Sequence, residues 1–376
     1  MKGSIYDDAT AQYEVLVDQV LEFIRCSQSR EELQFNELAL KLFNYQFQFN
    51  TVYQVFCRQQ GKTPRTVKDW RDIPAVPLQA FKRSTLSCTD SSKAEAIFMT
   101  SGTSNPEMRG KHYHPSLRLY DASMLAAFQQ HIMGGNELEV IKMIVLFPTK
   151  QQLPHSSLAH YLHLAVQYFG TDDSSYAVNE QGVDVERVVK LLESAEQAGE
   201  PVLLIGATFS FVHLLEQLQY LGRSFQLPTG SKLMDTGGTK GRSREVEQEQ
   251  LYSECVELLG ITRSGCSNMY GMTELSTQYY ETSHDKPGQK FGPPWIATRV
   301  VNPLTGKELP VGEVGVIVHC DLGNVNSVTT ILTDDLGYMT EDGGILLLGR
   351  AQGAAAKGCS LVMEEFVAAT NSFGTK

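Results

Sequence analysis

The sequence contains several short segments whose side chains can bind a phosphorylated ligand. The first, MTSGTSNP at 99–106, places four Ser and Thr hydroxyls around one glycine. Backbone N–H groups and hydroxyls in a turn hold phosphate oxygens without a large positive charge. The segment lacks the Gly-Lys-Ser/Thr ending of a P-loop. Taken alone, it leaves phosphate binding and an ordinary solvated loop as alternatives.

The second segment, DTGGTKGR at 235–242, follows a predicted strand and precedes a predicted helix. Ligands of open α/β sheets bind at the carboxyl ends of strands. Paired glycines also let a flat ring approach the backbone closely. The segment therefore indicates either a ligand site or a tight strand-to-helix turn.

The third segment, YGMTE at 270–274, combines a ring, a glycine, a hydroxyl and a carboxylate. Tyr270 can stack on a base, and Thr273 can donate a hydrogen bond to a phosphate. Glu274 can bind Mg²⁺, which prefers hard oxygen ligands. A strand end followed by a helix cap at Thr273 is the alternative.

The fourth segment, TDDLG at 333–337, has two consecutive carboxylates. An Asp at a turn can accept hydrogen bonds from both ribose hydroxyls, although Asp and Gly are common in turns of every kind. Arg350 and the segment KGCS at 357–360 come after it.

Alternating strand and helix patterns supply the elements that must position these segments. Apolar runs predict buried strands, and apolar residues at every third or fourth position predict helices. The predicted strands are 141–147, 202–205 and 232–235, and the predicted helices are 185–195, 211–221 and 245–259. This alternation predicts a mainly parallel sheet covered by helices.

The two ends of the chain have different patterns. Residues 11–25 predict an amphipathic helix, and 38–56 predicts a packed helical hairpin. After about residue 288, prolines separate short strand patterns such as 312–322 and 343–349, which indicates a smaller β-rich subdomain.

Composition excludes several classes of protein. The 376 residues carry a net charge of −11, which argues against a nucleic-acid-binding surface. No stretch approaches 18 apolar residues, so no membrane span is predicted, and the start MKGSIYDDAT lacks the apolar core of a secretory signal. The seven cysteines form no CxxC pair, which favours a reduced cytoplasmic protein without a disulfide framework or zinc site.

The order of these segments resembles the adenylate-forming superfamily, whose members activate carboxylic acids with ATP. Within it, the chain is most similar to the acyl-protein synthetases, the LuxE-type component of bacterial fatty-acid reductase. The resemblance covers roughly residues 60–362. It rests on TSGTSN (100–105), PHSSL (154–158), DTGGTKGRS (235–243), NMYGMTELSTQYYE (268–281) and KGCSL (357–361).

The resemblance implies an α/β fold, the large adenylating domain of two packed α/β sheets with a small β-barrel subdomain. We expect an adenylating region at 1–288 with a helical N-terminus, a β-rich subdomain at 289–350, and a flexible tail at 351–376. The usual mobile C-terminal domain with its lid lysine is expected to be absent, as in acyl-protein synthetases. The family's phosphate loop continues Gly-x-Pro-Lys-Gly, whereas NPEMR stands at 105–109, so Arg109 or Lys111 is expected to replace that lysine.

The implied reaction joins a fatty acid to AMP with release of pyrophosphate, using ATP and Mg²⁺. In this mechanism Thr273 contacts the α-phosphate, Glu274 holds Mg²⁺, Asp335 binds the ribose, and Arg350 reaches the ribose or a phosphate. His155 is a further candidate, to orient the substrate carboxylate, and an ordinary surface or core histidine is the alternative. The β- and γ-phosphates are assigned to Thr100, Ser101, Gly102, Thr103 and Ser104, and the adenine to Gly237, Gly238, Thr239, Tyr270, Gly271 and Met272.

The resemblance also implies a second step, in which Cys359 accepts the acyl group as a thioester. Lys357 would favour the thiolate, and the small residues before it would let the tail swing toward a partner. That partner is expected to be an acyl-CoA reductase-type enzyme, because the chain has no GxGxxG after a strand with which to bind a nicotinamide cofactor.

Two other functions remain as alternatives. An acyl- or aryl-CoA ligase would use CoA as the acceptor and would leave the protein unlabelled when CoA is omitted. A non-catalytic scaffold subunit that binds nucleotide or acyl-enzyme would form no adenylate that hydroxylamine could trap.

Overall fold

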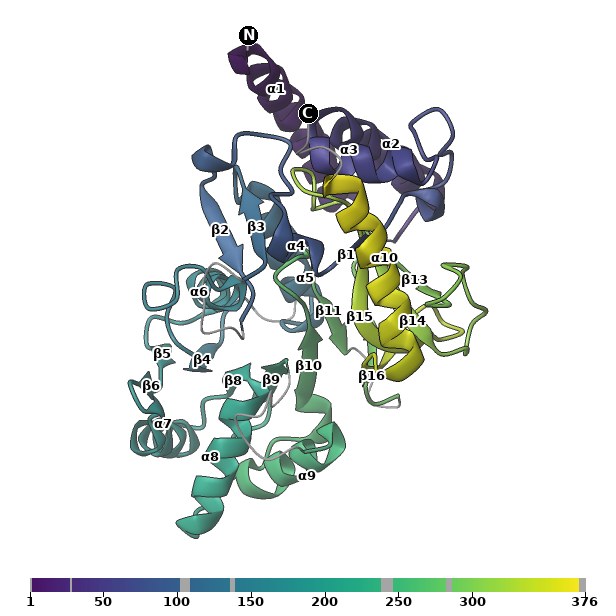
Figure 1. Cartoon of the computed structure of the whole chain (residues 1–376). Coiled ribbons are helices and arrows are strands. Elements are labelled where there is room, and N and C mark those ends of the chain that lie inside the picture. Colours follow the sequence, from purple (N-terminus) through teal and green to yellow (C-terminus); the bar gives the residue numbers. More distant parts are fainter. Residues whose placement is uncertain are drawn as a thin grey trace. The chain divides into compact units, whose positions relative to one another are not determined.

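A computed structural model describes residues 2–27, 29–101, 109–135, 139–237, 246–281 and 286–371. The chain divides into two compact units, whose elements are labelled in Figure 1. Unit 1 comprises Met1–Met124, Met272–Thr277 and Phe291–Lys376, and unit 2 comprises Leu125–Gly271 and Gln278–Lys290.

Unit 2 is built on a mostly parallel sheet. Its strands are β4 (Lys142–Leu146), β5 (Ser175–Tyr176), β8 (Val202–Ala207), β9 (Lys232–Thr236), β10 (Cys266–Tyr270) and β11 (Tyr279–Glu281). They are ordered β5-β4-β8-β9-β10-β11, parallel throughout except that β11 runs antiparallel to β10. β6 (Val178–Asn179) and β7 (Gly182–Val183) form a separate hairpin, and β12 (Gln289–Phe291) begins in this unit. The expected parallel sheet is confirmed.

Helices cover both faces of this sheet. They are α6 (Ser157–Phe169), α7 (Val185–Ala198), α8 (Thr208–Tyr220), α9 (Gln248–Leu259) and the end of α5 (Arg118–His131), with the short η4 (Arg263–Gly265) before β10. One apolar core joins α7, α8 and α9 to alternate residues of β4, β8 and β9. On the other face Tyr161 of α6 donates to the Met234 sulfur of β9.

Local sequence explains where the helices of unit 2 begin and end. The side chain of Asp184 caps α7 by accepting from the Arg187 N–H, and Gly199 ends it with a φ of 68°. Gly260 ends α9 in the same left-handed conformation. The strands and helices predicted between 141 and 259 are confirmed.

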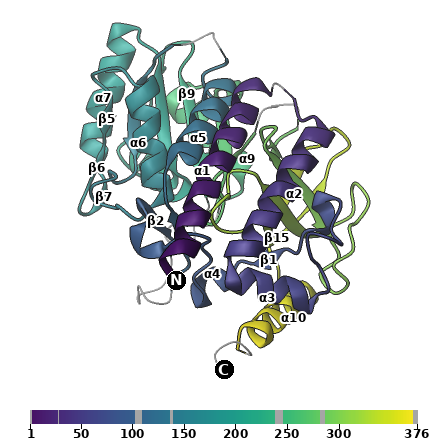
Figure 2. The same ribbon diagram turned by 90° about the horizontal axis from the view of Figure 1, so that it is seen from above.

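Unit 1 begins with helices, the first two of which lie side by side in Figure 2. They are α1 (Lys2–Cys26), α2 (Glu32–Phe49), α3 (Thr51–Gln59) and α4 (Ala80–Arg83), with the short turns η1 (Trp70–Asp72) and η2 (Ser91–Lys93). The expected N-terminal helix and helical hairpin are confirmed. Asn50 separates the hairpin's helices and caps α3, because its side chain accepts from the Tyr53 N–H.

The strands of unit 1 form two groups. The strands are β1 (Val76–Pro77), β2 (Ala96–Met99), β3 (Lys111–His114), β13 (Ile296–Val301), β14 (Gly315–Asp321), β15 (Thr330–Met339) and β16 (Ile345–Arg350). β13 to β16 pair antiparallel in chain order, β1 pairs with β15, and β2 and β3 form a hairpin. Strands are therefore present after residue 288, as the sequence pattern predicted, but they belong to unit 1 together with the N-terminal helices.

The C-terminal segment differs from the expected flexible tail, because residues Gly353–Asn371 form helix α10. Its residues Cys359, Met363, Phe366 and Ala369 are buried at helical spacing. Phe366 packs against Phe56 of α3 with ring centroids 5.3 Å apart, and Figure 2 shows α3 and α10 together. Burying one such side chain contributes roughly 1.5–3 kcal/mol. The Ala- and Gly-rich start concealed this apolar face.

None of the helices that the structure describes is both long enough and apolar enough to cross a bilayer.

Candidate functional site

The hydroxyl-rich segment connects β2 to β3 in unit 1. Thr100 closes the base of this loop: its N–H donates to the Gly110 carbonyl at 2.9 Å, and its hydroxyl accepts from the Gly110 N–H at 2.9 Å. Ser101 is exposed. Gly102, Thr103 and Ser104 lie outside the described residues, so their role in phosphate binding stays a prediction.

A helix that carries two cations borders the base of this loop. A Cβ at Gly110 would lie 3.5 Å from the Phe81 Cβ, so helix α4 packs against the loop base. Phe81 is followed by Lys82 and Arg83, two cations that the sequence analysis missed. Lys111, one of the two expected cations, is on β3.

Glu274 is a buried carboxylate in unit 1, with only 5% of its surface exposed. Burial raises the pKa of its carboxyl to about 7, while Arg350 and Lys82 oppose this rise and Asp334 adds to it. The three charges come from β16, α4 and β15. The structure therefore places Glu274 near both predicted and unpredicted charged residues.

Arg350 is held by the two carboxylates of the TDDLG segment. Its Nε lies 3.0 Å from Asp335 Oδ1, and its Nη1 lies 3.6 Å from Asp334 Oδ2. The register of β15 and β16 causes this arrangement, since Asp335 and Arg350 are directly paired. Asp335, proposed to bind ribose, is thus presented together with a guanidinium that can reach an anion.

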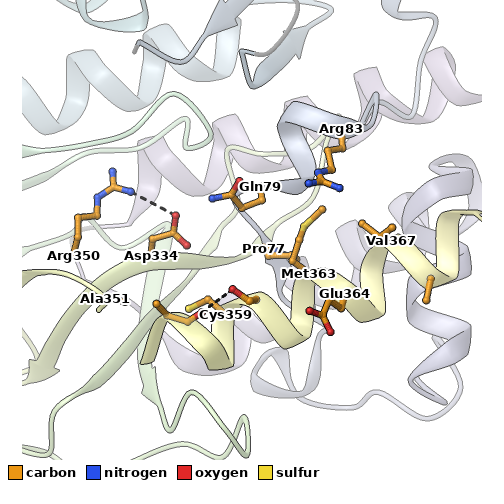
Figure 3. Close-up of a pocket in the computed structure, with 13 residues that line it drawn as sticks. Pro77, Gln79, Arg83, Asp334, Arg350, Ala351, Cys359, Met363, Glu364 and Val367 are labelled. Atoms are coloured by element: carbon orange, nitrogen blue, oxygen red, sulfur yellow. Dashed lines mark hydrogen bonds and ion pairs between the residues drawn. The ribbon is translucent and has the colours of Figure 1, made fainter. Parts of the chain in front are cut away.

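Cys359 lies on the wall of a cavity of about 840 Å³, shown in Figure 3. Asp334 and Arg350 line one end of the cavity, and Met363 and Val367 of α10 line its apolar side. The site thus brings together the predicted nucleophile and the predicted nucleotide-binding Arg350.

The thiol of Cys359 is nevertheless closed off. Only 9% of the residue is exposed, and its Sγ lies 3.8 Å from the Thr333 carbonyl oxygen. Burial and the negative charge of Asp334 raise its pKa to about 11. These described surroundings favour the thiol, whereas the expected effect of Lys357 on the thiolate stays a prediction. The Lys357 side chain lies outside the described residues.

In unit 2 the predicted adenine-binding residues lie at the carboxyl ends of two neighbouring strands, β9 and β10. Met269 of β10 pairs with Thr236 of β9, so Tyr270 and Gly237 follow at neighbouring positions. Gly237 has a φ of 81°, a conformation that favours glycine. Gly271 follows Tyr270, and Met272 opens the next segment. Gly238 and Thr239 lie outside the described residues.

A buried network supports this end of β9. The carboxylate of Asp235 accepts from the Thr208 hydroxyl at 2.5 Å, from the Tyr252 hydroxyl at 2.6 Å and from the Asn268 amide at 3.0 Å. Asp235 therefore stabilises the strand ends, a role that the turn-like sequence did not reveal. His155 is exposed just before α6, and its contact with a substrate carboxylate stays a prediction.

Mg²⁺ binding was predicted for Glu274. Among the described residues no group of three or more His, Cys, Asp and Glu side chains is arranged to hold a metal. A single buried carboxylate still fits Mg²⁺, which is held in many nucleotide sites by one or two carboxylates and by the substrate's phosphates. Burial raises the pKa of Glu274 because it disfavours the ionised carboxylate. A bound cation would stabilise that ionised form.

Solved structures of adenylate-forming ligases share this fold. The chain superposes on a 2-hydroxyisobutyryl-CoA ligase in complex with 2-HIB-AMP and CoA with a TM-score of 0.62 and 15% identity, over 86% of this chain and 77% of that one. The ATP-bound MatB of Rhodopseudomonas palustris matches with a TM-score of 0.50 and 19% identity, over 69% of this chain and 49% of that one. The expected α/β fold of adenylate-forming enzymes is confirmed.

Two curated proteins match nearly the whole sequence. The long-chain-fatty-acid–luciferin-component ligase of Vibrio harveyi is 25% identical over 360 residues, which are 92% of this chain and 91% of that protein. The Aliivibrio fischeri protein of the same name is 24% identical over 350 residues, or 88% of each chain. The family described as acyl-protein synthetase, LuxE, matches residues 8–368, and this protein therefore belongs to the LuxE acyl-protein synthetase family.

Proposed function

We propose that this protein activates a long-chain fatty acid with ATP and then carries the acyl group on Cys359. The observation that carries the proposal is the arrangement in unit 1 of Glu274, the Asp335–Arg350 pair and Cys359, in a chain of the LuxE family. The names of the Vibrio harveyi and Aliivibrio fischeri relatives support a long-chain fatty acid as the substrate.

In the first step a carboxylate oxygen of the fatty acid attacks the α-phosphorus of ATP. A new P–O bond forms, the bond to the β-phosphate breaks, and pyrophosphate leaves. Thr273 would donate to the α-phosphate, Asp335 would accept from the ribose hydroxyls, and Arg350 would offset negative charge on the phosphates. Thr100 and Ser101 would contact the outer phosphates, and Gly237 and Tyr270 the adenine.

Glu274 would hold Mg²⁺ during this step. When bound, the ion would reduce the repulsion between the two anionic substrates. Binding the ion requires the ionised carboxylate, so Glu274 must lose the proton that its burial favours.

In the second step the thiol of Cys359 gives its proton to solvent, and the sulfur attacks the acyl carbon of the adenylate. A C–S bond forms, the C–O bond to AMP breaks, and AMP leaves. Because the thiol is packed against the Thr333 carbonyl, the first turns of α10 must move before this attack. The thioester would then pass to an acyl reductase partner, because an acyl group held on the protein is useful only if an acceptor removes it.

The test is incubation with ATP, Mg²⁺ and labelled tetradecanoic acid without CoA. We expect the protein to acquire a label that neutral hydroxylamine releases, as it would from a thioester. Labelled acyl-CoA formed only when CoA is added would instead support a CoA ligase. Failure to trap any adenylate as a hydroxamate would leave the scaffold alternative.

A further inference from the structure

The segment Met272–Thr277 is held by three buried polar side chains from elsewhere in unit 1. His112 of β3 has its Nδ1 3.0 Å from the Thr273 carbonyl oxygen. Asn324 donates to the Glu274 carbonyl at 2.8 Å. Asp321, at the end of β14, accepts from the N–H groups of Ser276 and Thr277 at 2.9 and 3.0 Å.

The tautomer of His112 follows from its partners. A carbonyl oxygen can only accept, so the hydrogen bond to Thr273 requires a proton on Nδ1. Burial lowers the pKa of His112 to about 4, so the ring is neutral at pH 7 and carries one N–H. Its Nε2 therefore accepts from the Ser327 hydroxyl, which lies 3.1 Å away. The two nitrogens thus have separate tasks: Nδ1 holds Thr273, and Nε2 is fixed by Ser327.

The ring itself is locked in place. His112 is only 2% exposed, its ring lies against Phe81 at 5.9 Å between centroids, and it lies 4.2 Å from the His114 ring. β3 pairs with β2, the strand that leads into the hydroxyl-rich loop. β3 therefore carries His112 and also follows the hydroxyl-rich loop, on the side opposite β2.

The contacts fix the backbone on both sides of Glu274. The Thr273 carbonyl belongs to the peptide plane that precedes the Glu274 Cα, and the Glu274 carbonyl belongs to the plane that follows it. With His112 holding the first plane and Asn324 the second, the φ and ψ of Glu274 are determined. Those two angles set the direction of its Cα–Cβ bond, from which the side chain extends to the carboxylate.

We infer that His112 is a positioning residue for adenylation, whose Nδ1–H aims the Thr273 hydroxyl and the Glu274 carboxylate. The inference rests on the proposed function, in which these two groups contact the nucleotide and Mg²⁺. It adds a residue that acts through the backbone and that touches neither substrate. Misplacing reacting groups by about 1 Å can slow a reaction roughly 100-fold, so loss of this hydrogen bond should act on the rate of the chemical step.

The test compares two amides that each replace one ring nitrogen. In His112→Asn the amide nitrogen can occupy the place of Nδ1 and still donate to Thr273. In His112→Gln the amide reaches the place of Nε2 and contacts Ser327 instead. Both variants lose the ring packing and should lower the melting temperature by similar amounts, so a difference between them reports on the Thr273 hydrogen bond.

The readout is fatty-acid-dependent exchange of pyrophosphate into ATP. We expect His112→Gln to lower kcat roughly 10- to 100-fold with a smaller change in the KM for ATP, and His112→Asn to recover most of that loss. Ser327→Ala is the matched control, since it removes the other hydrogen bond of the ring and should leave kcat within a few-fold. Equal kcat values for the Asn and Gln variants, or a loss in Ser327→Ala as large as in the Gln variant, would overturn the inference.

Two further measurements separate this inference from the proposed function. Absence of exchange in the wild-type protein with any fatty acid overturns the proposed function itself. Amide hydrogen exchange of the peptide that covers 272–277 does not depend on activity, and it should be faster in His112→Gln than in His112→Asn. Equal exchange in the two variants would overturn the positioning role even if the enzyme is active.

Discussion

Replacing Glu274 by Gln should abolish adenylation and, at the same time, make the folded protein more stable above neutral pH. The carboxyl is buried, and its burial raises its pKa from 4.5 to about 7. Arg350 and Lys82 favour its ionised form and Asp334 opposes it, but burial has the largest effect. Carboxyl groups with strongly shifted pKa values are concentrated at functional sites, where a bound ligand can stabilise their charged form.

The magnitude follows from linkage between folding and proton binding. Between pH 4.5 and about 7 the folded protein keeps a proton on Glu274 that the unfolded chain has lost, so stability falls as the pH rises through this range. At 1.36 kcal/mol for each pKa unit, the cost is about 3 kcal/mol at pH 8 and close to zero at pH 4.5. Gln has the shape of the protonated acid and does not titrate, so Glu274→Gln should recover this amount at pH 8.

The assay is urea unfolding of wild type and variant at pH 5 and pH 8, with pyrophosphate exchange at saturating Mg²⁺ as the activity measurement. Glu365→Gln is the matched control, because Glu365 is exposed on α10 and the same chemical change there should alter neither quantity. A Glu274→Gln protein that is less stable than wild type at pH 8 would refute the electrostatic reasoning. Near-normal exchange would refute the Mg²⁺ assignment.

Three further predictions concern the thiol and the core of unit 2. Cys359→Ala should keep pyrophosphate exchange but acquire no hydroxylamine-labile acyl group, and full labelling of this variant would place the nucleophile elsewhere. Gly358→Ala should lower stability by about 1–3 kcal/mol and speed the alkylation of Cys359 by iodoacetamide. The added Cβ would collide with the Pro303 carbonyl oxygen, so α10 must move away. Unchanged alkylation would contradict this. Asp235→Asn should cost about 1–3 kcal/mol in urea unfolding. The amide oxygen can replace only one of the two carboxylate oxygens that now accept, and the new NH2 would face a donor in place of the other. Unchanged stability would count against the network.

Elements that depend on local pattern were predictable from the sequence. β4 and β8 are continuous apolar runs because both of their faces are buried, and α7 shows its apolar face, its capping Asp184 and its terminal Gly199 in the sequence itself. The motifs that we propose to bind the nucleotide were likewise recognisable, because each occupies a few consecutive residues.

Residues that act over long sequence separations were not predictable in this way. His112 and Thr273 are 161 positions apart, and nothing in the KHYH strand indicates that one of its histidines serves a distant turn. A partial signal was present after β14, where DLGNVNS places several polar residues in an apolar region; Asp321, Asn324 and Ser327 are all buried there. Helix α10 was missed for a different reason, because its Ala- and Gly-rich start concealed the apolar residues that recur at helical spacing.

The burial of Cys359 gives the two proposed half-reactions an order. With its pKa near 11, roughly one thiol in ten thousand is ionised at pH 7, so the described conformation is poorly suited to acyl transfer. The proposed adenylation needs no thiolate, because the groups assigned to it, Glu274, Asp335 and Arg350, lie outside α10. The close approach of Gly358 to Pro303 marks the end of α10 whose movement would free the thiol, while Phe366 anchors the other end on α3. In the proposed mechanism an adenylate would therefore form while the thiol remains protected. Acylation of the thiol would then depend on release of the first turns of α10.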